Sequence, residues 1–298
     1  MIEALRTPDA AFADLPGFAY EAHYVDDLAG YEGLRAAYVD EGPRDARHVY
    51  LCLHGEPTWG YLYRKMLPVF VGAGGRVVAP DFFGFGRSDK PVDERAYGFA
   101  FHREMLMRFI ERLDLRGITL VVQDWGGLLG LTLPPAMPDR FERLIAMNTA
   151  LAGGDVPIGP GFLAWQAYAN AHPDLDVAGL MRRAAPLSDA EAAAYGAPFP
   201  DVRYKAGVRA FPKLVPTRPE MEGAALARSA RSWWQTVWSG PTFNATGVLD
   251  PVLGLPAGRA LQAIVRGCPP PVEYAQAGHF LQEWGDAVAA DAVRALDR

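Results

Sequence analysis

An aspartate stands between an apolar run and a glycine pair near the middle of the chain. Residues 118–122 are apolar or β-branched, and Gln123-Asp124-Trp125-Gly126-Gly127 follows them. This order predicts a strand that turns sharply into a helix, and such a turn holds a nucleophilic side chain above the sheet. Because the helix N-terminus favours an ionised carboxylate, we expect Asp124 to be a carboxylate nucleophile. The other interpretation of Asp124 is a helix N-cap, a common place for Asp.

A second candidate segment follows the apolar run Val49–Leu53 and has the sequence HGEPTW at residues 54–59. In enzymes with such a turn, the loop after this strand supplies a backbone N–H to an oxyanion hole. We expect the N–H groups of Glu56 and Trp125 to form that hole. His54 competes for the role of catalytic base, but we predict a structural role because it ends the strand beneath the loop. The side chain of Glu56 is an alternative catalytic acid.

The histidine with the best context for a catalytic base lies near the carboxyl end of the chain. His279 belongs to the sequence AGHF at residues 277–280, after the last strand-like run and before a helix expected near Trp284. A histidine on that loop can reach across to the turn at Asp124. The acid that orients it should follow an earlier strand, and residues 247–251 supply Asp250 there. A turn residue is the other interpretation of Asp250, since Asp-Pro pairs are frequent in turns.

Only a particular arrangement of strands and helices would bring these candidates together. Short apolar runs rich in β-branched residues predict buried strands. They lie at Val49–Leu53, Val77–Ala79, Ile118–Val122 and Leu144–Met147. Apolar residues at helical spacing lie between them, most clearly from Phe101 to Leu113. This alternation predicts an α/β fold, a mostly parallel central sheet flanked by helices. An antiparallel hairpin is expected before it, from Tyr20–Tyr24 and Leu34–Val39.

The strand signal vanishes from Leu151 to about Glu222, where Ala, Pro and aromatic residues are frequent. Ser188 and Glu191 have the spacing of a capping box, which predicts one of several short helices. Strand-like runs return at 241–247 and 271–275. We therefore expect a core domain at 1–150 and 223–298, interrupted by an inserted helical cap at 151–222.

Composition and charge restrict the class of protein further. The chain has 298 residues, 50% hydrophobic and 21% charged, which is typical of a globular protein. With 29 Lys+Arg against 35 Asp+Glu, the net charge of -6 argues against nucleic acid or an anionic membrane as a partner. The N-terminal residues do not resemble a signal peptide, and we expect a cytoplasmic location. Cys52 and Cys268 supply neither a disulfide framework nor a zinc site, and we expect no metal and no cofactor.

Together, residues 54–59, 123–127, Asp250 and 278–280 resemble the haloalkane dehalogenases of the α/β-hydrolase superfamily. The similarity is to the subfamily whose triad acid follows the strand after the cap. It implies a halide site formed by two indole N–H groups, one from Trp125 and one from the cap. The segment at 161–165 resembles the family segment that carries the second indole, which indicates Trp165, with Phe162 lining the same pocket. A core position in the first cap helix is the alternative for Trp165.

The resemblance implies hydrolysis of a small haloalkane to an alcohol and a halide by Asp124, His279 and Asp250. A carboxylate suits this reaction because the alkyl ester that it forms can be hydrolysed, whereas the ether that a serine would form cannot readily be cleaved. The nearest alternative is an epoxide hydrolase, in which cap tyrosines protonate an alkoxide. The cap contains three tyrosines that could do so: Tyr168, Tyr195 and Tyr204. A ligand-binding protein without catalysis should have lost one of the three catalytic residues, and all are present.

Overall fold

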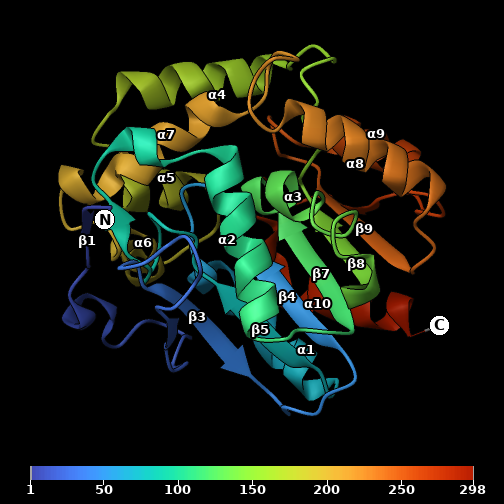
Figure 1. Cartoon of the computed structure of the whole chain (residues 1–298), viewed down its shortest axis with the longest axis horizontal. Helices are drawn as coiled ribbons and strands as arrows, with labels where there is room; N and C mark the ends of the chain where they lie inside the picture. Colours follow the sequence, from blue (N-terminus) through green and yellow to red (C-terminus); the bar gives the residue numbers. More distant parts are fainter. Residues whose placement is uncertain (1, 298) are drawn as a thin grey trace.

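The computed structural model describes residues 2–297, and a sheet of eight strands lies at its centre (Figure 1). The strands are β2 (His23–Val25), β3 (Ala36–Glu41), β4 (Val49–Leu53), β5 (Arg76–Pro80), β7 (Ile118–Gln123), β8 (Phe141–Met147), β9 (Thr242–Gly247) and β10 (Val272–Tyr274). Their order across the sheet is β10-β9-β8-β7-β4-β5-β3-β2. The strands from β10 to β5 run parallel, whereas β3 and β2 run antiparallel to their neighbours. A separate ladder pairs β1 (Ala4–Leu5) with β6 (Lys90–Pro91).

The central strands form where short apolar runs predict them. Every residue of β4 and β7 is buried, as expected for parallel strands that helices cover on both faces. The predicted α/β fold with a mostly parallel sheet is therefore confirmed. Because β4, β7, β8, β9 and β10 are parallel, their carboxyl ends meet at one edge of the sheet. The loops that follow these strands all lie at that edge, where ligands bind in open α/β sheets.

The N-terminal hairpin is antiparallel as predicted, but its strands begin and end elsewhere. The first strand is β2, which starts at His23 rather than Tyr20, and the second, β3, continues to Glu41. Ten residues, 26–35, connect them and include Gly30 and Gly33, so the expected connection with glycine is present. Leu28 and Leu34 within this connection are buried. Leu34, expected in the second strand, therefore packs in the core from the connection instead.

Helices cover both faces of the sheet. In Figure 1, α2 and α3 lie in front of the sheet, and α1 and α10 lie behind it. The helices of the core are α1 (Leu67–Gly72), α2 (Phe99–Arg112), α3 (Trp125–Gly130), α8 (Ala224–Thr236), α9 (Leu255–Ile264) and α10 (Gly285–Leu296). Short 3-10 helices are η1 (Asp9–Phe12), η2 (Gly60–Tyr63), η3 (Glu94–Ala96), η4 (Pro138–Arg140) and η6 (Leu281–Trp284). Between residues 2 and 297, no helix is long and apolar enough to cross a membrane.

The segment between β8 and α8 leaves the sheet and forms helices over its upper end in Figure 1. These are α4 (Pro160–Ala171), α5 (Val177–Ala184), α6 (Asp189–Gly196), η5 (Val202–Lys205) and α7 (Ala206–Leu214). The capping box begins α6, where Ser188 and Glu191 exchange hydrogen bonds. We propose residues 151–222 as the cap and 1–150 with 223–298 as the core. Met1 and Arg298, at the ends of that core, lie outside the described residues.

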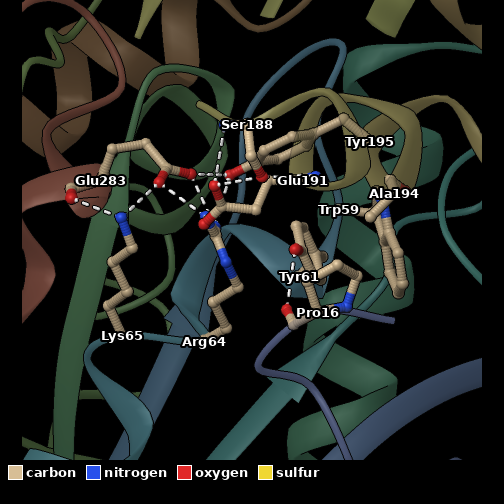
Figure 2. A network of polar contacts seen from close by, with 10 residues as sticks. All are labelled: Pro16, Trp59, Tyr61, Arg64, Lys65, Ser188, Glu191, Ala194, Tyr195 and Glu283. Atoms are coloured by element: carbon tan, nitrogen blue, oxygen red, sulfur yellow. Dashed lines mark hydrogen bonds and ion pairs between the residues drawn. The ribbon is translucent and has the colours of Figure 1, made fainter. Parts of the chain in front are cut away.

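A buried ion pair joins the cap to the core (Figure 2). Arg64, next to η2, donates from Nη1 and Nη2 to the two carboxylate oxygens of Glu283 in η6, at 2.6 and 2.7 Å. Its Nη2 also donates to Glu191 Oε1 of α6 at 3.0 Å, and the Tyr195 hydroxyl of α6 donates to Glu283. Arg64, Tyr195 and Glu283 are all buried. The charges are therefore compensated within the protein, and the cap is attached to the segment that follows His279.

Replacing Arg64 with Met should lower the free energy of unfolding by about 3 kcal/mol, the lower end for a broken buried ion pair. It removes two hydrogen bonds to the buried Glu283 carboxylate, whose Oε2 keeps an ion pair with Lys65 Nζ at 3.0 Å. Denaturation in urea measures this change. The control is Arg95→Gln, which removes an ion pair with Asp93 whose side chains are 91% and 49% exposed. It should leave the urea midpoint close to that of the parent, because water already solvates both charges. Equal stability of the two variants would contradict the role given to the buried pair.

Candidate active site

Asp124 occupies the turn between β7 and α3 in a backbone conformation that L residues rarely adopt. Its φ is 49° and its ψ is −125°, so the residue is strained. The two following glycines permit the turn: a Cβ on Gly126 would lie 1.9 Å from the Leu53 carbonyl oxygen, and one on Gly127 would lie 1.9 Å from Thr149 Oγ1. The predicted passage from strand to helix is present, although α3 has only six residues.

The Asp124 carboxylate is held between two other segments of the core. Its Oδ1 accepts a hydrogen bond from the Glu56 N–H at 2.9 Å, and its Oδ2 lies 3.5 Å from His279 Nε2. Asp124 is at the N-cap position of α3, but its side chain makes no capping hydrogen bond. The side chain is 16% exposed. It is therefore fixed in position and still accessible, as a nucleophile requires.

The imidazole of His279 lies between two carboxylates. Its Nδ1 is 2.8 Å from Asp250 Oδ2, and its Nε2 faces Asp124. Asp250, just after β9, is buried and accepts further hydrogen bonds from the Val252 N–H and from Asn148 Nδ2, both at 2.8 Å. The structure thus brings the three predicted residues, from segments far apart in the chain, into one line of contacts.

Burial and charge oppose each other at this site. Burial alone would lower the pKa of His279, but the negative charges of Asp250 and Asp124 outweigh it and raise that pKa to about 10. Burial would raise the pKa of Asp250, yet His279 and the hydrogen bonds from Val252 and Asn148 bring it down to about 2. Asp250 is therefore ionised at neutral pH, and the free protein favours the imidazolium form of His279.

Glu56 and His54 occupy different environments in the loop after β4. The Glu56 side chain is buried, and desolvation together with the Asp124 charge raises the pKa of its carboxyl group well above the usual value. His54 is fully buried: its Nδ1 contacts the Gly55 carbonyl, and its Nε2 accepts from the Phe82 N–H. Burial lowers the pKa of His54 to about 4. Both ring nitrogens of His54 are therefore occupied by backbone groups, as a structural role requires.

A cavity of about 980 Å³ lies next to Asp124, lined by residues of both core and cap. Most of the lining is apolar. Trp125, Phe162 and Trp165 all line it, together with Asp124 and His279. The structure thus places every side chain predicted for the substrate pocket and halide site around one cavity. Between residues 2 and 297, no group of three or more His, Cys, Asp or Glu side chains could hold a metal ion.

The two tryptophans predicted to bind halide have indole N–H groups without a protein acceptor among residues 2–297. The indole N–H groups of Trp59, Trp234 and Trp238 each donate to a protein oxygen, at 3.2, 2.8 and 3.0 Å. Those of Trp233 and Trp284 donate to no described residue either, and Trp284 also lines the cavity whereas Trp233 does not. The backbone N–H of Trp125, at the first residue of α3, likewise donates to no other described residue. Such donors beside an apolar cavity are available to an anion.

The cap tyrosines considered for an epoxide hydrolase do not line this cavity. The Tyr195 hydroxyl bonds Glu283 in the buried network, and Tyr168 stacks on His172 near the surface. Tyr204 is also absent from the lining, and no tyrosine among the described residues lines the cavity. An alkoxide formed at Asp124 would therefore find no tyrosine hydroxyl as a proton donor. This geometry argues against the alternative interpretation of the chain as an epoxide hydrolase that uses cap tyrosines.

Two polar side chains whose contacts the sequence analysis missed also belong to the site. Asn148, just after β8, donates to Asp250 and accepts from the Gly247 N–H at 2.8 Å. Gln123, the last residue of β7, places its Nε2 3.0 Å from His279 Nε2. Each stands at the carboxyl end of a parallel strand, and that position is the signal that could have identified them.

Comparison with known proteins agrees with this geometry. The family model that describes the alpha/beta hydrolase fold matches residues 49–286, so the chain is an α/β hydrolase. A haloalkane dehalogenase of Psychrobacter cryohalolentis is 45% identical over 97% of this chain and 96% of its own length. One of Mycolicibacterium paratuberculosis is 41% identical over 95% and 94%. The chain belongs to the haloalkane dehalogenase family, and it is an enzyme that hydrolyses haloalkanes.

A solved structure gives the same result for the whole fold. The haloalkane dehalogenase DpaA of Paraglaciecola agarilytica, whose structure is described as tetrameric, superposes with a TM-score of 0.96. It is 50% identical, and the match covers 98% of each chain. The predicted resemblance to this family is therefore confirmed, along the cap as well as the core.

Removing the charge of Asp124 should lower the pKa of His279. Asp124→Asn deletes one of the two carboxylates that favour the imidazolium, and a charge at this distance contributes on the order of one to three pH units. NMR titration of the histidine ring nitrogens measures the effect. The control is Asp189→Asn, at an exposed carboxylate of the cap, which should leave the pKa of His279 unchanged. An unaltered pKa in Asp124→Asn would show that the two residues are not coupled.

Proposed function

We propose that this enzyme hydrolyses haloalkanes by covalent catalysis, with Asp124 as nucleophile, His279 as base and Asp250 as the acid that orients it. The observation that carries this proposal is the position of the Asp124 carboxylate. It lies beside an apolar cavity, accepts the Glu56 N–H, and faces an imidazole that is itself held by a buried carboxylate. Such an arrangement suits nucleophilic attack followed by hydrolysis at the same carboxyl group.

In the first step, an oxygen of Asp124 attacks the halogenated carbon. A carbon–oxygen bond forms, the carbon–halogen bond breaks with its electron pair, and an alkyl ester and a halide result. The halide needs no proton, and the indole N–H groups of Trp125 and Trp165 would stabilise it. An indole N–H is a donor only and cannot accept a proton from the reaction. Phe162 and the other apolar residues around the cavity would keep water away from the halide and the nucleophile.

In the second step, His279 takes a proton from water, and the water oxygen attacks the carbonyl carbon of the Asp124 ester. The N–H groups of Glu56 and Trp125 would stabilise the negative oxygen of the tetrahedral intermediate. Its collapse breaks the bond between that carbon and the alcohol oxygen. The proton on His279 passes to the departing alkoxide, which leaves as the alcohol. The Asp124 carboxyl group that results gives the second proton of the water to His279, so Asp124 is an ionised carboxylate again and the ring is an imidazolium, the form that the free enzyme favours.

The charges around His279 explain why it can act as a base only after the first step. Asp124 and Asp250 both raise the pKa of His279 in the free enzyme. Alkylation turns Asp124 into a neutral ester and removes one of these charges. The pKa of His279 should then fall, so that the ring loses its proton and can act as base in the alkyl-enzyme. Formation of the ester thereby prepares the group that hydrolyses it.

We further propose a small halogenated hydrocarbon as substrate and the cytoplasm as the location. The apolar lining of the cavity supports an apolar substrate. Cys52 and Cys268 are both free, which suits a reducing compartment. These features agree with the net charge of -6, which argues against a nucleic acid or membrane partner.

The variant His279→Gln should release about one equivalent of halide and then stop, because the ester forms but no base activates water. Mass spectrometry of the intact protein should show the alkyl group, and peptide mapping should place it on Asp124. The control is His172→Gln, at an exposed histidine of the cap, which should turn over normally. Continued turnover of His279→Gln without an adduct would exclude His279 as the base.

The variant Trp165→Phe should slow halide release by roughly 10- to 150-fold. It keeps most of the apolar surface but removes one donor to an anion, a contribution of ~1.5–3 kcal/mol at 1.4 kcal/mol per decade of rate. Chloride and bromide should also quench its tryptophan fluorescence less than that of the parent. Trp233→Phe, in α8 and away from the cavity, is the control. Unchanged halide affinity and rate in Trp165→Phe would eliminate this halide site.

A further inference from the structure

Gln123 is a fully buried side chain whose amide contacts the proposed base. It is the last residue of β7 and stands directly before Asp124. Its Nε2 donates to the backbone carbonyl of His279 at 3.1 Å and lies 3.0 Å from Nε2 of the same residue. Its Oε1 is buried and has no hydrogen-bond partner. The mechanism above gives this side chain no role.

The orientation of the Gln123 amide follows from its first contact. A backbone carbonyl oxygen only accepts hydrogen bonds, so the NH₂ group of Gln123 must face His279. The second N–H of the same NH₂ group is then available to the Nε2 lone pair of the imidazole. That contact is favourable when Nε2 is unprotonated and the ring proton is on Nδ1, which donates to Asp250. When Nε2 carries a proton, two donors face each other.

The Gln123 N–H favours the unprotonated ring of His279, whereas the carboxylates around His279 favour the protonated ring. Asp250, after β9, and Asp124, after β7, both favour the protonated ring. Glu56, from the loop after β4, interacts with both His279 and Asp124, and burial raises the pKa of its carboxyl group. Gln123 is neutral and remains in place when Asp124 becomes an ester. Its effect is therefore present in the alkyl-enzyme, where the base must be unprotonated.

We propose that Gln123 is a positioning residue that, in the alkyl-enzyme, keeps the Nε2 lone pair of His279 free of a proton until water donates to it. The proposal rests on the proposed function of His279 as base. Once the proton has moved from water to Nε2, the Gln123 N–H faces an N–H and disfavours the imidazolium. Transfer of the proton from His279 to the departing alkoxide is thereby favoured, and this transfer releases the alcohol. Gln123 itself gains and loses no proton.

The test compares the two steps of the reaction in Gln123→Met, which has a similar volume and no donor. Rapid mixing with a bromoalkane gives the rate of halide release, and the decay of the alkyl-enzyme gives the rate of hydrolysis, each across a range of pH. We expect halide release within about twofold of the parent. The midpoint of the hydrolysis profile should move up by about half to one pH unit, the equivalent of one hydrogen bond. Hydrolysis should therefore be slower several-fold near neutral pH and recover above the midpoint.

The pH profile separates this role from a merely structural one. Displacement of His279 would slow hydrolysis by the same factor at every pH and leave the midpoint of the pH profile unchanged. Either that result or a pH profile identical to the parent's would overturn the proposal. Gln123→Glu, which replaces the donor facing Nε2 by a carboxyl group, should shift the midpoint in the same direction and serves if the Met variant does not fold. Gln282→Met is the matched control, because Gln282 is another fully buried glutamine and has no hydrogen bond to His279. It should leave the midpoint unchanged.

Failure of the proposed function gives a different result. If His279 is not the base, the parent enzyme shows no alkyl-enzyme whose decay depends on the protonation of His279, and His279→Gln accumulates no adduct. If only the inference about Gln123 fails, both of those observations hold, and Gln123→Met has the midpoint of the parent. The two outcomes are therefore distinguishable in the same set of measurements.

Discussion

The close packing of the turn at Asp124 against β4 is the constraint on which the site depends. The backbone of α3 approaches the end of β4 so closely that Gly126 has no room for a Cβ beside the Leu53 carbonyl. This approach brings the loop after β4 next to the turn, so that the Glu56 N–H meets the Asp124 carboxylate. The positive φ of Asp124 then directs its side chain away from the sheet. The strain is balanced by the buried strands on either side, which cannot shift without breaking the sheet.

The electrostatics of the site come from charges that water screens little. Asp250 and the Glu56 side chain are buried, the His279 side chain is only 16% exposed, and each has a pKa displaced from its usual value by burial and by its neighbours. In such surroundings, the loss of one charge has a large effect on the next group. The reaction changes the charge of Asp124 itself. The protein therefore needs no moving part to distinguish the free enzyme from the alkyl-enzyme.

The amino-acid sequence predicts the fold and the main site residues because their signals are local. Apolar runs indicate the central strands, and the positions of Asp124 and His279 directly after strands indicate where they lie. Asn148 and Gln123 also stand at strand ends, so their nearness to the site could have been expected, but their partners depend on side-chain contacts across 102 and 156 residues. The bounds of the two strands of the N-terminal hairpin also differ from those that alternation alone indicates. Tyr195 could be identified as a cap tyrosine, but only the fold shows that its hydroxyl belongs to the ion-pair network.

The Arg64 network limits how the cap could be exchanged between related enzymes. A graft of the cap alone would bring a new helix in place of α6 and would leave Arg64 and Glu283 in the recipient core. A donor cap without Tyr195 and Glu191 would cover two buried charges with groups that do not complete their hydrogen bonds. The functional module is therefore discontinuous in the chain: it consists of the inserted helices together with one residue beside η2 and one in η6. Recombination at the cap boundaries would preserve the enzyme only where both parents share that set of residues.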